Sequence, residues 1–472
     1  MLIVICFTIL IGLLFSLVDR KSSLIIILFT GLILRIIISS DLFLHNWDER
    51  FHAVVAKNIM LHPLKPTLYE VELISADIND WTKSHIWLSK PPLTFWIVGT
   101  SLKLFGHNEF ALRAPSIMLG LISVYLTYLI GLKLYNRKIG LLSSFLHSIH
   151  GLSLELNGGL VSSDHVDTLF LCLFELAIYL IIHSINSKNV LNNVCIGAII
   201  GLAYLTKWTM CIFIIILMVP ICIQNYKKVA DFVFFFMIVL CSFFLVALPW
   251  NVYLFKFYPV ESSWMFGQLL TPINSAIQGH EGGILFYLDN IRIIFAELIY
   301  LILIWAFVKY KKLSSTSFNI ILAWIFVPLI ILSIAETKRY TYVMMSAPSF
   351  FILTAIFIQW VQNLKLEKYK YARVIALVIL LGLPIRYSLE RIKPFKPRLV
   401  IPAWRNEMKA LEKINIENQD IVLINEPHYM NAMFYFNFIA YENDLSSNDL
   451  VRIKEQGYIT FRNIEGKYHL VK

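Results

Sequence analysis

Charged residues are scarce in this chain. They make up 15% of its 472 residues, whereas hydrophobic residues make up 58%. A soluble domain typically has about 25% charged and about 45–50% apolar residues. The scarcity of charge excludes an ordinary soluble protein, and the sequence predicts an integral membrane protein with many helices across the bilayer.

Cysteine is also rare and avoids the polar loops. All of it lies within apolar segments, at Cys6, Cys172, Cys195, Cys211, Cys222 and Cys241. This placement argues against disulfides and a cysteine metal site, and it indicates small hydrophobic side chains packed in helices. The first 18 residues lack a basic start and a clear cleavage site, so we expect no cleavable signal peptide.

Long basic tracts and internal repeats are likewise missing. The net charge of +10 is spread over short clusters between apolar segments. Such clusters set the orientation of membrane helices, which excludes nucleic acid as the partner. Transporters often contain inverted repeats around a central site, and we find no repeat here.

Apolar segments of about 20 residues, the length that crosses a bilayer, recur along the chain. They lie at 1–18, 22–40, 114–134, 141–159, 165–184, 190–206, 208–224, 231–249, 286–308, 317–335, 340–360 and 372–388. We therefore predict a polytopic α-helical membrane protein with about 11–13 transmembrane helices. Residues 90–105 are apolar but short, and we expect a helix lying in the membrane interface.

The basic clusters predict the orientation. Arg20-Lys21, Arg137-Lys138, Lys227-Lys228 and Lys311-Lys312 all fall on alternate connections, which should face the cytoplasm. The other side receives a first external loop, 41–113, and a second, 250–285. We expect the membrane domain over 1–390 and a small soluble α/β domain over 391–472 on that external side. In it, "DIVLIN" and "GYITFRN" are predicted strands, "NEMKALEKIN" is a predicted helix, and "YMNAMFYFNFIAYE" could be either.

Unusual polar residues gather on the predicted external face. They are Asp48, Glu49, Lys90, Asp164, Asp167, Lys207, His280, Lys338, Arg339 and Tyr342. Ionisable groups at membrane depth are costly and usually functional. Cations there can hold a lipid phosphate, and a carboxylate beside them can take a proton from an attacking group. Taken one at a time, these residues have plainer interpretations: Asp48-Glu49 could be a solvated acidic pair, and Lys207 could extend from a helix end to the interface. Because all of them share one face, we favour a functional site.

Four stretches in this order resemble the C-type glycosyltransferase superfamily, in the branch of protein O-mannosyltransferases and the aminoarabinose transferase of lipid A. They are "WDERFHAVVAKNI", "SKPPLTFWIVGTSLKLFGHNEFALRAPSIMLG", "GLAYLTKW" and "KRYTYVMMSAP". The resemblance covers residues from about 45 to 360. Its most specific piece joins Lys-Pro-Pro-Leu to a Phe-Gly turn and an Arg-x-Pro-Ser helix entry.

The resemblance implies an inverting glycosyltransferase that uses a polyprenyl-phosphate-linked sugar. Asp48 matches the catalytic base, Glu49 would orient it or contact the acceptor, and Asp164 matches a second functional acid. Lys90, Lys207, Lys338, Arg339 and Tyr342 would bind the donor phosphate. The acceptor, which could be lipid A, a protein or a glycan, would be met on the extracytoplasmic face of a membrane, with the bacterial inner membrane expected.

The chain departs from the family pattern at two places. Relatives often carry arginine where this chain has Phe51, and the arginine here is Arg50. Some relatives bind a divalent metal between the residue before Lys-Pro and a histidine of the later loop. Here these residues are Ser89, a poor ligand, and His280, with His85 and Glu281 as potential helpers.

Two other classes of function remain. A transporter or flippase of a lipid-linked sugar would also need a polar cavity, but its charges usually meet at the bilayer midplane rather than at one interface. A structural membrane scaffold would leave the shared face of carboxylates and cations unexplained. Asp48→Asn discriminates the enzyme from the flippase, because only the enzyme needs this proton acceptor.

Overall fold

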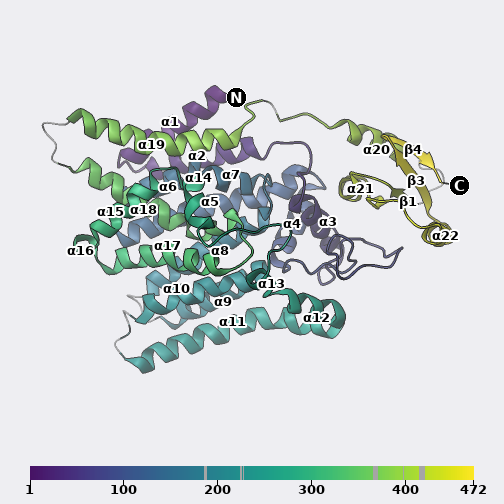
Figure 1. Ribbon diagram of the computed structural model, residues 1–472, viewed down its shortest axis with the longest axis horizontal. Coiled ribbons are helices and arrows are strands. Elements are labelled where there is room, and N and C mark those ends of the chain that lie inside the picture. The colour runs from purple at the N-terminus through teal and green to yellow at the C-terminus, as the bar shows by residue number, and fades with distance from the viewer. Residues whose placement is uncertain are drawn as a thin grey trace.

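A bundle of helices and a small mixed sheet make up the protein (Figure 1). The computed structural model describes residues 1–184, 189–223, 226, 228–364, 370–396, 398–413 and 420–471. The sheet lies beyond one end of the bundle, near α3 (Asp48–Leu61) and α4 (Leu93–Phe105). This confirms the predicted class, a polytopic helical membrane protein with a small C-terminal α/β unit.

Seven helical segments in the described residues are long and apolar enough to cross a membrane. They are α5 (Glu109–Leu134), α8 (Asp164–Ser184), α9–η1–α10 (Val190–Lys207, Trp208–Cys211, Ile212–Ile223), α11 (Val229–Phe257), α17 (Thr316–Ile334), η2–α18 (Tyr340–Ser346, Ala347–Gln362) and α19 (Lys370–Ile392). Helices α14 (Phe286–Phe295) and α15 (Ile299–Val308) are bent by 111° relative to each other. They add an eighth segment if the pair crosses the membrane as one span.

The described residues thus contain fewer such segments than the predicted total of about 11–13. Helices α1 (Leu2–Leu17) and α2 (Ser23–Ile38) have 16 residues each. At 1.5 Å per residue they extend only about 24 Å. The expected span over 141–159 is instead divided into α6 (Arg137–Ile149) and α7 (Gly151–Asn157), because the backbone is extended at His150. Its side chain accepts a hydrogen bond from the Ser153 amide and so caps α7.

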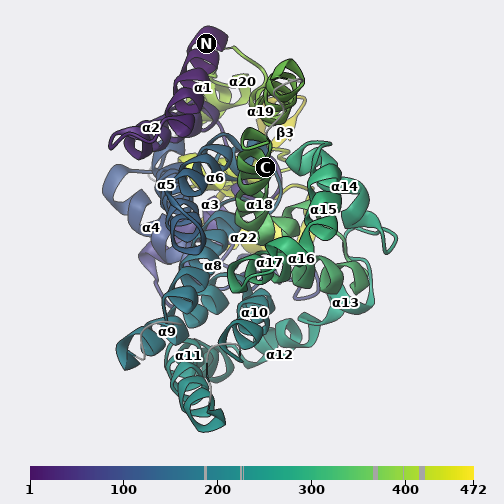
Figure 2. The ribbon, with the colours of Figure 1, turned by 90° about the vertical axis from the view of Figure 1, so that its left-hand side faces the viewer.

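The bundle has an enclosed centre and an apolar rim. The most apolar stretches of α8 and η2–α18 are 83% and 89% buried. Both helices lie in the middle of the bundle when it is viewed end on (Figure 2). The corresponding stretches of α11 and α19 are only 22% and 17% buried. Apolar helices that leave this much surface uncovered are suited to contact lipid.

The two ends of the bundle differ in charge. Helix α16 (Tyr310–Leu313), which contains Lys311 and Lys312, lies at the end opposite α3, α12 (Pro259–Gln268) and α13 (Thr271–Asn274) (Figure 1). This separation agrees with a basic cytoplasmic face and external loops on the other side.

The described residues of the C-terminal unit form a four-stranded sheet and three helices. The strands are β1 (Ile421–Ile424), β2 (Ile439–Ala440), β3 (Ile459–Ile464) and β4 (Lys467–Leu470), and the helices are α20 (Ala403–Lys413), α21 (Tyr429–Phe436) and α22 (Ser447–Glu455). The strand order is β2-β1-β3-β4, with β1 parallel to both neighbours and β4 antiparallel to β3. The stretch that could be helix or strand forms both, as α21 and β2.

This unit is docked firmly on the membrane part. Its apolar side chains share one core with those of α3 and α4, including Phe51, Phe95 and Met430. Polar contacts close the interface: Arg405 and Tyr435 both bond to Glu109 at the start of α5, at 2.6 and 2.7 Å. The C-terminal unit therefore forms one wall of the external region.

Candidate active site

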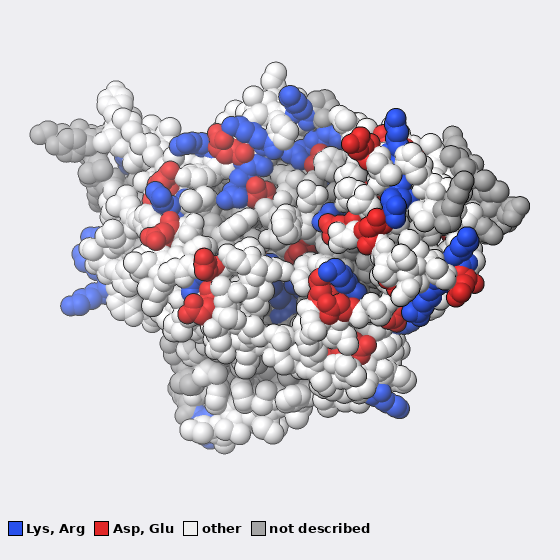
Figure 3. Space-filling model, turned by 45° about the vertical axis from the view of Figure 1, so that its right-hand side comes forward, with Lys and Arg blue, Asp and Glu red and all other residues white. Residues whose placement is uncertain are grey.

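A cavity of about 440 Å³ opens at the end of the bundle that carries α3, α12 and α13 (Figure 1). Its walls come from the first external loop, the break between α9 and α10, helix α12 and the segment before η2. Figure 3 shows basic side chains recessed in a hollow on this side of the molecule. Among the residues singled out in the sequence, Asp48, Lys90, Lys207, Arg339 and Tyr342 all line the cavity. The fold thus brings together residues that are far apart in the chain.

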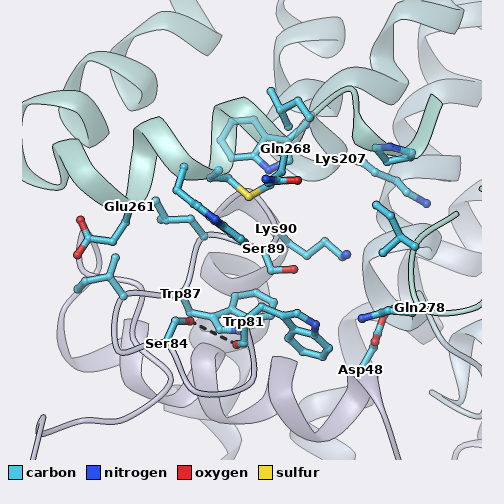
Figure 4. Close-up of a pocket in the computed structure, with 18 of the residues that line it drawn as sticks. Asp48, Trp81, Ser84, Trp87, Ser89, Lys90, Lys207, Glu261, Gln268 and Gln278 are labelled. Carbon is cyan, nitrogen blue, oxygen red and sulfur yellow. Dashed lines mark hydrogen bonds between the residues drawn. The ribbon is translucent and has the colours of Figure 1, made fainter. Parts of the chain in front are cut away.

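Asp48 is the first residue of α3 and faces the cavity (Figure 4). The backbone N–H of Ser163 donates to its Oδ2 at 2.9 Å. Burial raises the pKa of Asp48, but His52, Lys90, the Ser163 amide and Arg339 together outweigh burial and hold the pKa below its usual value. Asp48 is therefore an ionised carboxylate at neutral pH and can accept a proton.

His52 lies one helical turn after Asp48 and also lines the cavity. Its Nδ1 is 2.8 Å from Oδ1 of Asp164, within hydrogen-bond distance. Burial lowers the pKa of His52, whereas Asp164 and Asp48 raise it, and the net shift is upward. Asp164 is completely buried behind the histidine. It thus acts on the cavity through His52.

His52 was missed when roles were assigned from the sequence. The signal was present in "DERFH", where the histidine follows Asp48 by four residues. Side chains with this spacing lie on one face of a helix.

Three cations converge opposite Asp48. Figure 4 shows Lys90 and Lys207 extending toward the same space, with Asp48 across from them beside Gln278. Arg339 donates to Ser163 Oγ at 3.1 Å and to Gln278 Oε1 at 2.9 Å. Lys207 pairs with Asp167 and lies 4.8 Å from the centre of the Tyr342 ring.

Lys90 is the cation best placed to receive a ligand. Among the described residues, its ammonium makes no hydrogen bond or ion pair. Burial lowers the pKa of Lys90, Asp48 raises it, and Arg339 and Lys207 lower it further. An anion bound here would relieve the repulsion among the three cations.

The backbone around the cavity is strained. Ser163, Trp208 and Gln278 line it with φ of 68°, 25° and 53°, and Trp47, next to Asp48, has φ of 70°. Left-handed backbone at residues other than glycine is uncommon and is concentrated at functional sites. At Ser163 this conformation accompanies an amide that points at Asp48.

Lys338 has a different place from the one predicted. It is buried, and its ammonium donates to the carbonyls of Ser333 and Ala335 at the C-terminal end of α17. A lysine in this position satisfies carbonyls that have no partner within the helix. It does not line the cavity, and its ammonium completes the hydrogen bonds at the end of α17.

Glu49 is enclosed in a second network behind the cavity. It accepts from Nε and Nη2 of Arg113 at 2.7 and 3.0 Å, and neither side chain has exposed surface. Burial raises the pKa of Glu49, but Arg113 and His45 lower it well below the usual value. Glu49 does not line the cavity, and its pair with Arg113 ties α3 to α5.

Arg50 does not replace the arginine that relatives carry at the place of Phe51. Its guanidinium lies 5.6 Å from the ring centre of Phe51 and 5.9 Å from that of Tyr429. It therefore packs toward the C-terminal unit and is absent from the cavity wall.

The residues do not fit the divalent metal site implied for His280. The described part of the chain contains no group of three or more His, Cys, Asp or Glu side chains that could hold a metal ion. The backbone carbonyl of His280 accepts from the Lys338 amide at 2.8 Å. His280 thus belongs to the loop that packs against Lys338.

The chain is similar to known proteins in sequence. A family model described as dolichyl-phosphate-mannose-protein mannosyltransferase matches residues 89–252. The undecaprenyl phosphate-alpha-4-amino-4-deoxy-L-arabinose arabinosyl transferase of Yersinia pestis is 23% identical over 334 residues, 69% of this chain and 60% of the relative. An uncharacterized protein of Aquifex aeolicus is 35% identical over 99 residues, 21% of this chain and 17% of that protein. The chain spans about 60% of the length of the Yersinia relative.

The fold is also shared with solved structures. ArnT from Cupriavidus metallidurans bound to undecaprenyl phosphate has a TM-score of 0.67 at 11% identity, covering 94% of this chain and 93% of that one. An oligosaccharyltransferase from Archaeoglobus fulgidus in the apo form has a TM-score of 0.59 at 11% identity, covering 94% and 69%.

The protein is thus a polytopic membrane protein with the fold of these enzymes. Its sequence is similar to the mannosyltransferase family model over residues 89–252 and to the aminoarabinosyl transferases over 69% of the chain.

Proposed function

We propose that the protein is a membrane glycosyltransferase that moves a sugar from a polyprenyl-phosphate donor to an acceptor outside the cytoplasm. One observation carries the proposal: an ionised Asp48 faces Lys90, Lys207 and Arg339 across a single cavity. A carboxylate and a cluster of cations in one space match the two charges of the reaction, a proton to be taken and a phosphate to be released.

The carboxylate and the cations each take part in one stage of the transfer. The acceptor hydroxyl or amine gives its proton to Asp48 and forms a bond with the anomeric carbon of the sugar. The bond from that carbon to the phosphate oxygen breaks, and its electron pair leaves on the polyprenyl phosphate. Lys90 and Arg339 stabilise the charge that develops on this phosphate. Because the acceptor attacks opposite the leaving group, the anomeric centre is inverted.

The neighbouring residues hold these groups in place. The Ser163 amide fixes one oxygen of Asp48, and Ser163 Oγ accepts from Arg339, so a single residue bridges the base and the cation cluster. His52 is held by Asp164 and keeps Asp48 ionised. Lys207 is oriented by Asp167 toward the same space. Such preorganisation lowers the cost of aligning the reacting atoms.

We further propose that the cavity faces the periplasm of a bacterial inner membrane. The basic α16 lies at the opposite end of the bundle, and a polyprenyl tail would lie against the apolar rim while its phosphate reaches the cations.

Asp48→Asn tests the proposal. Because the amide cannot take a proton, sugar transfer should fall by about 10²- to 10⁴-fold, while undecaprenyl phosphate still binds the purified protein. The readout is mass spectrometry of lipids and glycoconjugates from cells in which the gene is deleted. These cells carry a copy of the wild-type gene, the Asp48→Asn gene or the control Asp420→Asn gene. Asp420→Asn changes an exposed carboxylate of the C-terminal unit. Transfer at the wild-type rate by Asp48→Asn would refute the assignment and favour a flippase.

A further inference from the structure

A second cavity, of about 220 Å³, adjoins the first. It lies between the first external loop and the C-terminal unit, which contributes Tyr429 and residues 441–445. Glu72, Ala76 and His85 line both cavities. A group bound in the second cavity would therefore be within reach of the first.

Three buried tyrosines line the second cavity. Tyr69, Tyr429 and Tyr441 are only 7%, 3% and 7% exposed. The rings of Tyr69 and Tyr441 stack, with centres 5.3 Å apart and an interplanar angle of 19°. None of the three hydroxyls has a hydrogen-bond partner among the described residues, and none is sealed from solvent. The three hydroxyls are thus available to a polar ligand in the cavity that these residues line.

The rim of the cavity is acidic. Glu72, Asp77, Glu442 and Asp444 line it. Asp444 pairs with Arg462 at 3.1 Å, and Lys83, which also lines the cavity, pairs with Asp80 at 3.0 Å. The other three carboxylates have no ion-pair partner in the described part of the chain. The rim thus attracts ammonium groups and hydroxyl donors and repels phosphates.

We propose that the second cavity is the acceptor subsite and that it takes an amine-bearing saccharide. This inference rests on the proposed function and names its acceptor class. Tyrosine faces pack against the apolar faces of sugar rings, while carboxylates and tyrosine hydroxyls bind sugar hydroxyls and an ammonium. A cavity of about 220 Å³ suits a ring better than a peptide, which binds in a long groove or along a sheet edge.

The two cavities would sort the substrates by charge. The anionic donor is drawn to Lys90, Lys207 and Arg339 in the first cavity, and the cationic acceptor is drawn to the acidic rim of the second. Each substrate is repelled by the other's site, so neither occupies both.

Binding to the purified full-length protein in lipid nanodiscs tests the subsite. The probes are a glucosamine trisaccharide, its fully N-acetylated counterpart, which has the same rings without the positive charges, and a lysine-rich peptide. We expect the amine form to bind at least about 10-fold more tightly than the acetylated form, equivalent to about 1.4 kcal/mol. Equal affinities, or tighter binding of the peptide, would overturn the proposal.

Variants locate the binding. Glu442→Gln and Tyr441→Phe remove one rim charge and one free hydroxyl without removing a ring, and each should weaken binding of the amine trisaccharide several-fold. Glu455→Gln, an exposed change on α22 outside the cavity, is the control and should bind like the wild type. Unchanged binding in both Glu442→Gln and Tyr441→Phe would place the saccharide elsewhere and refute the subsite.

The subsite and the proposed function fail separately. Asp48→Asn should bind the amine trisaccharide like the wild type, because Asp48 does not line the second cavity. If transfer depended on Asp48 but no variant changed trisaccharide binding, only the subsite would be wrong. If trisaccharide binding followed the prediction but transfer did not depend on Asp48, the catalytic proposal alone would fail.

Discussion

At the residue scale, Asp48 and His52 form the chemical centre of the cavity. They lie one turn apart on α3, and Asp164 fixes the histidine from behind. The pKa of Asp48 is lowered although burial alone would raise it, and His52 is the largest of the groups that oppose burial. The state of the base therefore depends on a residue that does not itself take part in proton transfer.

His52→Gln tests this dependence. Without the imidazolium, the charged form of Asp48 is less favoured, so the pKa of Asp48 should rise and the base should be lost at a higher pH. In a profile of kcat/KM against pH, the acidic limb should move to higher pH while the maximum rate falls less than in Asp48→Asn. His469→Gln, an exposed change on β4, should leave the profile unchanged. An acidic limb that does not move in His52→Gln would show that the histidine is only structural.

The residues that sequence reasoning placed well are those whose motif fixes their surroundings. Lys90 is followed by two prolines that keep it at the cavity wall, and Lys207 ends α9 at the break. Glu49 and Lys338 were assigned functions because they stand beside functional residues in the chain. Their partners, Arg113 in α5 and the end of α17, are set by tertiary packing, which adjacency in sequence does not reveal.

At the scale of elements, the buried Glu49–Arg113 pair fastens α3 to α5. Arg113 also donates to the carbonyls of Ser39, Asp41 and Phe43, so the same side chain ties down the chain that enters α3. The Arg-x-Pro-Ser motif of the sequence thus has a structural role: its arginine positions the helix that carries Asp48.

Glu49→Gln should therefore lower stability. Removing one partner leaves a buried guanidinium without its counter-charge, at a cost of about 3–5 kcal/mol. We expect a lower thermal midpoint in detergent than for the exposed control Glu455→Gln. The double variant Glu49→Gln/Arg113→Gln should lose less than the sum of the two single changes. Strictly additive losses would mean that the two side chains are not coupled.

Hydropathy predicted the apolar helices but not where they break. The interruption at His150 and the 111° bend between α14 and α15 each fall within a segment that hydropathy predicts as one span. Both depend on backbone conformation at one or two residues, such as Ala296 with φ of 70°. A hydropathy window averages over such residues, so the sequence yielded more spans than the described structure supports.

At the scale of the whole molecule, the cavity, the first external loop and the C-terminal unit share one end of the bundle. The small α/β unit could be anticipated from the change in composition after the last apolar segment, but its packing on α3 and α4 could not. The second cavity could not, because it exists only where Tyr69 meets Tyr441 from the far end of the chain.

This arrangement predicts which residues are accessible from outside the cell membrane. A cysteine at Asn79, in the external loop, should react with a membrane-impermeant maleimide in spheroplasts, whereas one at Ser314, after α16, should react only once the membrane is permeabilised. The wild-type chain, with its own cysteines, provides the background. Labelling of Ser314→Cys before permeabilisation would reverse the orientation.

The most direct test of the central claim is a structure of the protein with undecaprenyl phosphate bound. The account predicts that the phosphate contacts Lys90 and Arg339, faces Asp48 across the first cavity and leaves Lys338 on the carbonyls of α17. A phosphate bound beside Lys338, or outside the cavity that contains Asp48, would contradict it.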